Sequence, residues 1–478
     1  MPLYLHNTLG NEKQRFLPAP HAKEVRMYNC GPTVYGRQHI GNLSMFVFTD
    51  TLRRTLEFNS FSVKQVINFT DFGHLTSDGD EGADKMTAGL KREGLKPTLE
   101  NMRTLGEKYA NLFLEDIRSL NVEVDKITFP RASDYIPAQI AMVQALEEKG
   151  YAYRGDVGVY FDTSRFPEYG ALGDINLEGL RVGARVEANI EKRNPTDFLL
   201  WKSNKKLGWE SPWGRGFPGW HIECSAMIRA ILGNQIDIHT GGIEHIPVHH
   251  NNEIAQSESA TGKKPLARFW LHRAHLQLGG AKIAKSGGNV VYLSDIIERG
   301  FHPLALRYLL LGAHYRTNSN FTWEALAAAQ TAYAKLVAFR LSYADVTPGN
   351  VSQYWGVQIM RHINDDLDTP GALALIWEMT KDGSVPPADF LATLFYADRV
   401  LGLRLKEPDG EARKLALPHI QQEVVDSDLP PEIQALLKER DEARLEKNWQ
   451  RADELRSHIE AAGYTLEDTG GSSRVFKQ

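Results

Sequence analysis

Strand-type and helix-type hydrophobic patterns alternate near the start of the chain. Two short apolar runs have the length of buried strands: "EVRMYNCGPTV" at residues 24–34 and "FSVKQVINFTDF" at residues 61–72. Residues 43–59 lie between them and carry apolar side chains at helical spacing. Strand, helix and strand in this order predict a parallel α/β unit.

The α/β pattern is interrupted and then resumes. Residues 84–150 follow a helical pattern, and residues 151–166 alternate as a hairpin with Gly and Asp at its turn. A helix-then-strand pattern returns at residues 216–242. We therefore expect an insertion that divides a Rossmann-type parallel-sheet domain into two halves.

Helical patterns dominate the second half of the chain, with apolar stripes in residues 296–345 and 351–405. The Pro- and acid-rich residues 415–432 are predicted to be a linker, followed by two amphipathic helices and a terminal polar strand or tail. The predicted fold class is therefore α/β, with helical domains and a small C-terminal domain after the parallel sheet. The predicted divisions are the first half of the Rossmann-type catalytic domain (1–130), the insertion (131–210), the second half (211–295), two helical regions (296–345 and 346–415) and the C-terminal domain (416–478).

Composition narrows the class of protein but not its function. A chain of 478 residues predicts roughly two to four domains. Two cysteines cannot build a disulfide framework, which favours a reducing cytoplasm. No apolar run has membrane-spanning length, and the first residues lack a secretion signal pattern. The net charge of −5 neither indicates nor excludes nucleic-acid binding, so composition predicts a soluble multidomain enzyme.

Four scattered residues form a candidate metal site. Cys30 and Cys224 are too far apart for a local zinc knuckle, whereas His249 and Glu253 are four residues apart and share a helix face. Two thiolates, an imidazole and a carboxylate are all zinc ligands. His250 is expected to point away from this face. Spacing alone equally allows buried cysteines that act as small hydrophobes, a surface His–Glu contact or an incidental disulfide.

Two segments form a candidate nucleotide site. "HIGN", residues 39–42, lies between the first predicted strand and its helix, where backbone N–H groups and the helix dipole attract phosphate. The Gly-rich "GGAKIAKSGGN", residues 279–289, offers Lys282 and Lys285, which can close over a triphosphate. Each segment also has a purely structural interpretation, as a helix start or a solvated basic turn.

The motifs together resemble those of the cysteinyl-tRNA synthetase family of class I aminoacyl-tRNA synthetases. They occur in the family's order over nearly the whole chain: "MYNCGPTVYGRQHIGN", "NFTDFGH", "KRNPTDFLLWK", "PGWHIECSAM", "DIHTGG", "PVHHNNEIAQSESATG", "FWLH", "LRYLLLGAHYR" and "KNWQRADELRSHIEAAGYTLEDT". The resemblance implies a cytoplasmic monomer that uses ATP with Mg²⁺ to activate L-cysteine and transfers it to the 3′ end of tRNA(Cys).

The resemblance also implies roles for individual residues. One Zn²⁺ per chain would be held by Cys30, Cys224, His249 and Glu253 and would select the cysteine thiolate over serine. The substrate pocket would include Cys30, Thr70, Trp220 and Glu244. ATP would be bound by Gly31, Thr33, His39, Gly41, Asn42 and Lys285. His39, Asn42, Lys282 and Lys285 would act in catalysis.

Three positions depart from the family pattern. The KMSKS motif is KIAKS here, so both lysines are present but Ile283 and Ala284 replace Met and Ser. Asn42 replaces the last His of HIGH and can still donate a hydrogen bond. Glu244 stands where aspartate is usual, and its longer side chain is expected to alter the pocket.

RNA binding by the tail rests on the resemblance. From Pro431 onward, eight Lys/Arg and ten Asp/Glu give a net charge of −2. The candidate RNA contacts are Arg444, Trp449 and Arg451, with Arg440, Arg456 and Phe476 as further possibilities. Pattern alone favours salt bridges between these arginines and Glu439, Glu442 and Glu446. Two alternatives to tRNA charging remain, a cysteine ligase acting on a small amine and a non-catalytic paralogue.

Overall fold

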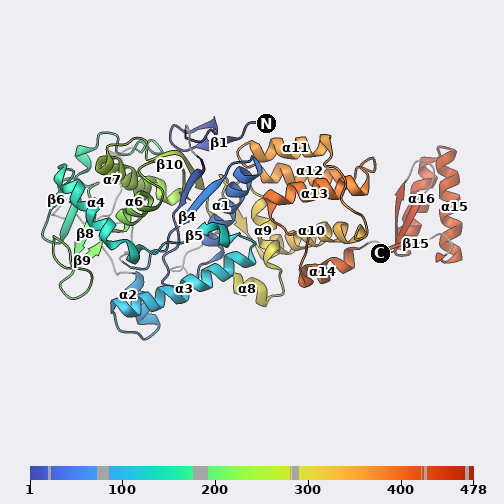
Figure 1. Cartoon of the computed structure of the whole chain (residues 1–478). Helices are drawn as coiled ribbons and strands as arrows, with labels where there is room; N and C mark the ends of the chain where they lie inside the picture. The colour runs from blue at the N-terminus through green and yellow to red at the C-terminus, as the bar shows by residue number, and fades with distance from the viewer. Residues whose placement is uncertain are drawn as a thin grey trace.

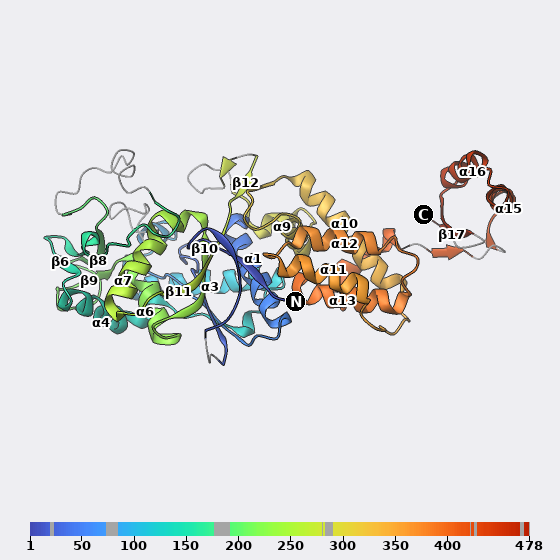
Figure 2. The same ribbon diagram turned by 90° about the horizontal axis from the view of Figure 1, so that it is seen from above.

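The computed structural model describes residues 1–19, 23–72, 85–175, 192–279, 281–282, 290–420, 422–424, 428–468 and 473–477. Figure 1 shows the α/β part at one end, a group of helices beside it and the C-terminal unit at the far end. Figure 2 shows the same succession from above. Within the described ranges, no helix has both the length and the apolar character needed to cross a membrane.

A five-stranded parallel sheet is the centre of the α/β part. In space its strands run β11-β10-β3-β4-β5, and every neighbouring pair is parallel. The strands are β3 (Val25–Asn29), β4 (Val63–Ile67), β5 (Ile127–Thr128), β10 (Ile236–Gly242) and β11 (Ala267–Arg273). The predicted Rossmann-type α/β fold class is confirmed.

Helices pack against both faces of this sheet, because successive side chains of a strand point to opposite faces. Met27 of β3 shares an apolar core with Phe48 and Leu52 of α1 (Ile40–Phe58). The next residue, Tyr28, belongs to a different core with Met227 of α6 (Trp220–Ile231). The connecting helices are α2 (Lys85–Arg92), α3 (Leu99–Ser119), α4 (Ile136–Glu148) and α7 (Asn251–Thr261).

The strand order reverses beside β3. The chain passes from β3 to β4 on one side, and β10 joins β3 on the other side only after the insertion. Ligands of open parallel sheets bind outside the carboxyl ends of the strands at such a switch point. Cys30 follows β3 directly and therefore lies at this point.

A second, four-stranded antiparallel sheet lies in the order β6-β7-β8-β9, and its last strand follows residue 210, the predicted end of the insertion. Its strands are β6 (Ala152–Arg154), β7 (Gly158–Phe161), β8 (Phe198–Ser203) and β9 (Gly216–Pro218). The hairpin predicted at residues 151–166 is confirmed, since Ala152 pairs with Phe161 across β6 and β7.

Helices follow the α/β part and lead to the C-terminal unit. The helices are α8 (Leu293–Glu298), α9 (Pro303–Leu311), α10 (Trp323–Ser342), α11 (Gln353–Asn364), α12 (Thr369–Met379), α13 (Pro387–Leu401) and α14 (Gly410–Ala416). The remaining short strands are β1 (Tyr4–Asn7), β2 (Glu12–Arg15), β12 (Leu276–Leu278), β13 (Ala281–Lys282) and β14 (Ser319–Phe321).

The C-terminal unit packs two helices against a three-stranded antiparallel sheet, in the order β15-β17-β16. Its elements are β15 (Gln422–Val424), α15 (Pro431–Leu445), α16 (Trp449–Ala461), β16 (Tyr464–Asp468) and β17 (Ser473–Lys477). The prediction of a plain linker at 415–432 is wrong for residues 422–424, which pair with residues 475–477. Local composition could not show this because the partner strand lies about fifty residues further on.

Candidate metal and nucleotide site

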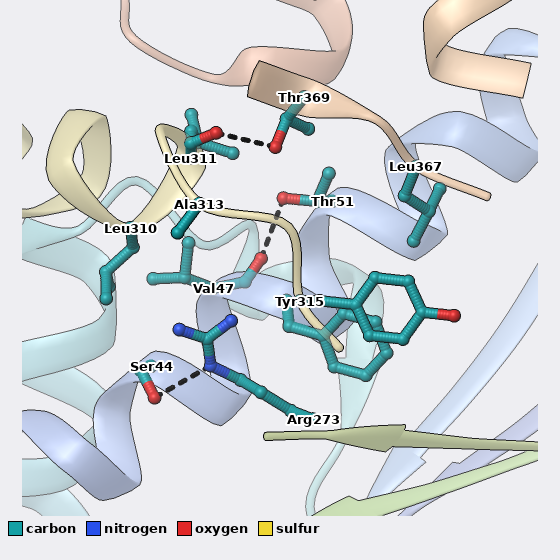
Figure 3. A pocket seen from close by; sticks show the side chains of 11 residues that line it. Ser44, Val47, Thr51, Arg273, Leu310, Leu311, Ala313, Tyr315, Leu367 and Thr369 are labelled. Atoms are coloured by element: carbon teal, nitrogen blue, oxygen red, sulfur yellow. Dashed lines mark hydrogen bonds between the residues drawn. The ribbon is translucent and has the colours of Figure 1, made fainter. Parts of the chain in front are cut away.

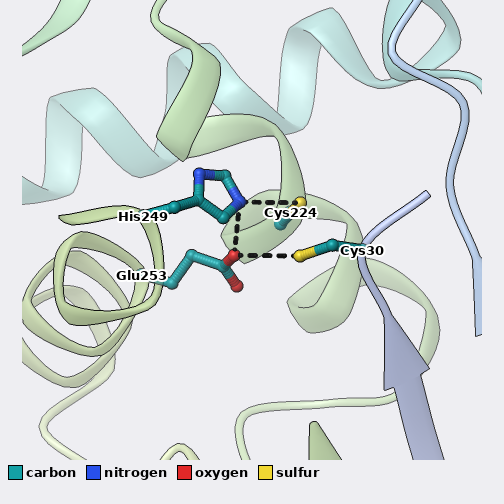
Figure 4. Close-up of side chains that lie close together, drawn as sticks. All are labelled: Cys30, Cys224, His249 and Glu253. Atoms are coloured by element: carbon teal, nitrogen blue, oxygen red, sulfur yellow. Dashed lines mark hydrogen bonds and ion pairs between the residues drawn. The ribbon is translucent and has the colours of Figure 1, made fainter. Parts of the chain in front are cut away.

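The four predicted metal ligands meet at the switch point of the sheet. Cys30 follows β3, Cys224 lies in α6, and His249 and Glu253 lie on a continuous helical segment that ends in α7. Each of the four contributes one ligand-type atom, and these atoms all lie within 4.8 Å of one another. All four residues are buried, and Figure 4 shows their side chains converging from three directions.

Hydrogen bonds and an ion pair connect this cluster. His249 Nε2 lies 2.7 Å from Glu253 Oε1, as the four-residue spacing predicts. The Cys30 thiol donates to the same carboxylate oxygen at 3.6 Å, and Cys224 Sγ lies 3.8 Å from His249 Nε2. The fold therefore brings together donor atoms from segments that are far apart in the sequence.

His250 also contacts the cluster, so the expectation that it points away is wrong. Its Nε2 atom lies 3.3 Å from Cys30 Sγ. Adjacent helical residues point apart, but the two cysteines approach from different sides: Cys224 meets His249, and Cys30 meets His250. A π-helical turn, Ile246–His250, carries both histidines, and such turns are frequent at functional sites.

A second donor set overlaps the first. Cys30 and Glu253 also lie within ligand distance of His239 and His250. Glu253 uses its other oxygen here, with Oε2 at 2.7 Å from His239 Nε2. Sequence spacing did not predict this set, because the direction of His239 depends on the register of β10 in the sheet.

Burial and mutual attraction set the charges of the cluster. Burial raises the pKa of Cys30 well above its usual range, and its hydrogen bond to Cys224 adds to this effect. That same bond stabilises the Cys224 thiolate against burial and lowers its pKa to about 6. Burial also opposes the charged forms of Glu253 and His249. For Glu253, the attraction of His239 and His249 outweighs burial and holds the pKa well below its usual range. For His249, the attraction of Glu253 outweighs burial and raises the pKa to about 10.

Neutral histidines surround the cluster and orient it. His221 Nδ1 lies 2.9 Å from His249 Nδ1, and His272 Nε2 lies 2.8 Å from His250 Nδ1. Burial lowers the pKa of His221, His250 and His272 well below the usual range, so these rings are uncharged. The sequence did contain a signal for them, since seven of the sixteen histidines fall between residues 221 and 275.

The predicted substrate residues lie at different distances from the cluster. Trp220 stacks on the ring of His249, with centroids 4.2 Å apart. The Thr70 hydroxyl donates to Glu223 Oε2 at 2.7 Å, and Glu223 directly precedes Cys224 in the sequence. The Glu244 side chain is instead 44% exposed and lies 3.5 Å from His275 Nδ1. Trp220 and Thr70 thus border the cluster, whereas Glu244 faces His275.

Glu223 is a site residue that the sequence analysis missed. It is fully buried, and its Oε1 atom has no hydrogen-bond partner in the part of the chain that the structure describes. Burial raises its pKa well above the usual range for a carboxyl group, which favours the protonated form of the side chain. It holds the Thr70 hydroxyl beside the cluster.

The segment that follows Cys30 is tied to the segment that follows β4. The Gly31 N–H donates to Asn68 Oδ1 at 2.9 Å, and the backbone of Thr70 bonds to Pro32 and Val34. A Cβ at Gly31 would lie 1.6 Å from the carbonyl oxygen of Asn68. Glycine is therefore required at position 31, because the backbone of Asn68 lies too close for a side chain. Two residues further on, Thr33 forms a parallel β-bridge with Thr70.

The HIGN segment begins α1 as predicted. His39 is the N-cap, and its Nδ1 atom accepts the Asn42 N–H at 3.2 Å, which leaves the proton of the neutral ring on Nε2. Gly41 lies in the first turn, and its carbonyl accepts the Ser44 hydroxyl at 2.7 Å. The Asn42 amide already donates to Gln38 Oε1 at 2.6 Å. This segment thus presents a helix N-terminus with an ordered imidazole.

The lysine loop is only partly described. Lys285, with Ile283, Ala284 and Ser286, lies outside the described residues, and for Lys282 the backbone alone is described, in β13. The chain after the loop pairs with the start of α1, since the Ile40 N–H donates to the Val291 carbonyl at 2.9 Å. The end of the loop is therefore anchored beside HIGN.

The arginines of the C-terminal unit are paired with acids. Arg440 is buried and lies 2.8 Å from Asp468, so it does not line an exposed face. The other pairs are Arg444 with Asp468 at 3.0 Å, Arg451 with Glu439 at 2.8 Å and Arg456 with Glu460 at 2.9 Å. Phe476 is buried and cannot stack on a base, whereas Trp449 is 60% exposed at the start of α16.

Comparison of the catalytic part of the chain with known proteins identifies the class of enzyme. Residues 16–331 match the family model described as tRNA synthetases class I (C) catalytic domain. The fold is similar to a Mycobacterium tuberculosis methionyl-tRNA synthetase bound by methionyl-adenylate, with a TM-score of 0.56 at 13% identity. That likeness covers 83% of this chain and 96% of the other and supports the fold. The fold and the catalytic-domain match define a class I aminoacyl-tRNA synthetase.

The tail and the full-length relatives identify the family. Residues 426–475 match the model described as cysteinyl-tRNA ligase anticodon binding domain. A cysteine–tRNA ligase of Burkholderia lata is 44% identical over 100% of this chain and 97% of its own length. One of Treponema denticola is 41% identical over 99% of both chains. The chain belongs to the cysteine–tRNA ligase family.

Proposed function

We propose that this chain activates L-cysteine with ATP and transfers the cysteinyl group to the 3′ end of tRNA(Cys). The observation that carries the proposal is the buried cluster of Cys30, Cys224, His249 and Glu253 at the switch point of the sheet. It occurs in a chain whose whole length matches cysteine–tRNA ligases. A cytoplasmic, monomeric state is part of the proposal, and the reducing compartment agrees with the two unpaired cysteines.

The cluster fits a zinc ion. Its donor set has the types and number of a tetrahedral zinc site, and His249 is oriented through its second nitrogen by His221. We assign the ligands to Cys30, Cys224, His249 and Glu253, because two sulfur donors suit zinc better than the single sulfur of the overlapping set. A bound zinc ion would coordinate the thiolate of the substrate, which the hydroxyl of serine cannot match.

The surrounding residues shape the amino-acid pocket. Trp220 stacks on His249 and forms a wall next to the cluster. The hydrogen bond between Thr70 and Glu223 fixes the segment after β4 beside α6. A steric pocket alone discriminates weakly between residues as similar as cysteine and serine, so selection is assigned to the sulfur-binding cluster.

ATP is assigned to the start of α1. The His39 Nε2–H and the N-terminus of α1, with Gly41 and Asn42, would bind phosphate oxygens. Gly31 and Thr33 are the other residues assigned to ATP. A carboxylate oxygen of cysteine attacks the α-phosphorus and pyrophosphate leaves. Lys282, Lys285 and a Mg²⁺ ion bound with ATP would stabilise the negative charge of the pyrophosphate. A ribose hydroxyl of the tRNA then attacks the carbonyl carbon and AMP leaves. Positioning and charge stabilisation suffice for both steps.

The C-terminal unit is assigned to tRNA recognition. Trp449 is the strongest contact candidate, because it is exposed and aromatic. Arg444 and Arg451 remain candidates only if RNA phosphates replace their present partners, Asp468 and Glu439.

The test is transfer of labelled cysteine to total tRNA by the purified protein with ATP and Mg²⁺. We expect ATP-dependent charging that chelation abolishes. Cysteine-dependent ATP–pyrophosphate exchange without charging would instead indicate a cysteine ligase acting on a small amine. Absence of activity in both the charging assay and the exchange assay would indicate a non-catalytic paralogue.

A matched pair of variants tests the metal assignment. Cys224→Ser is expected to lower bound zinc and to raise the KM for cysteine at least about tenfold. Ala230→Ser changes an exposed residue of the same helix, α6, and should leave the zinc content unchanged. Unchanged zinc and unchanged KM in Cys224→Ser would overturn the assignment.

A further inference from the structure

A buried arginine at the end of β11 has no carboxylate partner among the residues that the structure describes. Arg273 is 5% exposed, and its Nε atom donates to Ser44 Oγ at 2.9 Å. Its Nη2 atom is buried and has no hydrogen-bond partner in the described part of the chain. Burial alone lowers the pKa of Arg273 to about 10, which still leaves it charged at neutral pH.

Two other buried arginines of this protein do have a carboxylate partner. Arg53 and Arg307 are fully buried, and each contacts the Asp50 carboxylate, at 2.6 and 2.7 Å. A buried charge without a counter-charge is costly, and proteins usually pair it. Arg273 is therefore a buried cation whose counter-charge is not a described side chain.

The guanidinium of Arg273 faces a small cavity. The cavity has a volume of about 20 Å³ and lies between α1, the end of α9 and the start of α12. Its lining is mainly apolar and includes Val47, Leu310, Ala313 and Leu367. Figure 3 shows the guanidinium of Arg273 lying between Ser44 and Val47. This volume holds one particle about the size of a water molecule.

The lining hydroxyl groups already donate elsewhere. The Ser44 hydroxyl donates to the Gly41 carbonyl, and the Thr51 hydroxyl donates to the Val47 carbonyl. The Thr369 hydroxyl donates to the Leu311 carbonyl at 2.7 Å. A polyatomic anion that needs several donors would find too few here, and a water molecule would leave the charge of Arg273 uncompensated.

We propose that this cavity binds one small monovalent anion of the halide class, held by the guanidinium of Arg273. A single negative charge matches the single guanidinium, and a monatomic anion matches the volume and the apolar lining. The site joins β11 to α1 and to the end of α9, so the bound anion stabilises the junction between the sheet and the helices that follow it.

Thermal unfolding in chloride tests the site in the full-length protein. Sodium chloride is exchanged for sodium gluconate at constant ionic strength, since gluconate is too large for the cavity. The midpoint of the wild type should rise with chloride and follow the linkage relation for one bound ion. Arg273→Met should abolish this rise, whereas Arg268→Met, a half-buried arginine of the same strand, should keep it.

Two further measurements keep the proposal testable if Arg273→Met does not fold. Ala313→Leu fills the cavity but retains Arg273, and it should also abolish the chloride response. Crystals soaked in bromide should show an anomalous peak in the cavity, beside the guanidinium of Arg273. A wild-type midpoint that ignores chloride, an equal response in Ala313→Leu, or a cavity without bromide would each overturn the proposal.

Discussion

Asp50 is the centre of a buried charge network that links the sheet domain to the helices. It lies on α1, the helix that begins at HIGN, and is fully buried. Its carboxylate contacts Arg53 at 2.6 Å, Arg54 at 2.7 Å and Arg307 of α9 at 2.7 Å. Arg307 also donates to the carbonyls of Leu120 and Leu401, after α3 and at the end of α13.

The substitution Asp50→Asn keeps the shape of the side chain and removes its charge. Arg53 would retain Glu57 at 3.0 Å and Glu123 at 2.7 Å. Arg307 would retain no ion pair among the described residues, since Asp50 is its one acidic partner there. Stranding one buried charge typically costs about 3–5 kcal/mol. We expect the midpoint temperature of the first unfolding transition to fall by roughly 6–20 °C for a domain of about 150–250 residues.

The assay is thermal unfolding followed by circular dichroism, with Asp365→Asn as the matched control. Asp365 pairs with Lys13, but its side chain is 57% exposed, so the same substitution there should change stability by about 0–1 kcal/mol. Equal midpoints for Asp50→Asn and Asp365→Asn would refute the reasoning.

The pH dependence of this loss follows from the pKa of Asp50. Burial opposes its charge, but the three guanidinium groups outweigh burial and hold the pKa well below the usual range. The stabilisation is therefore complete above the pKa of the unfolded carboxyl, about 3.9, and is lost as the pH falls toward the folded value. The difference between wild type and Asp50→Asn should stay constant from about pH 5 to 8 and narrow below about pH 4.

Three further variants test individual residues. Gly31→Ala places a Cβ 1.6 Å from the Asn68 carbonyl oxygen, so we expect a loss of at least about 1–3 kcal/mol, read from the urea midpoint. Lys285→Ala should slow adenylate formation in single-turnover assays by roughly 10²–10³-fold with little change in cysteine affinity; equal losses in both would place the loop in another role. Trp449→Ala should raise the KM for tRNA by about 5- to 150-fold, because it removes the stacking free energy of roughly one base, about 1–3 kcal/mol. The rate of ATP–pyrophosphate exchange should not change. Leu445→Ala, at a 76% exposed position of the same unit, is its control.

The sequence predicts the parallel sheet because its strands and helices carry their own hydrophobic periods. It also offers the residues of the cluster, since Cys30 follows a predicted strand and Glu253 lies four residues after His249. Spacing alone left other interpretations of these residues open, and the family resemblance selected the set of four.

Other features depend on contacts between distant segments and could not be predicted locally. His239 and His272 reach the site through the register of β10 against β11. Residues 422–424 form a strand because residues 475–477 offer a free edge. Arg440 and Phe476 are buried by the packing of the C-terminal unit, which a charge pattern does not reveal.

X-ray absorption at the zinc edge tests the central claim most directly. The account predicts one zinc ion per chain with two sulfur and two nitrogen or oxygen neighbours, from Cys30, Cys224, His249 and Glu253. Adding L-cysteine should introduce a third sulfur, and adding L-serine should not. A protein-derived shell with a single sulfur, or a spectrum that L-cysteine leaves unchanged, would contradict the account.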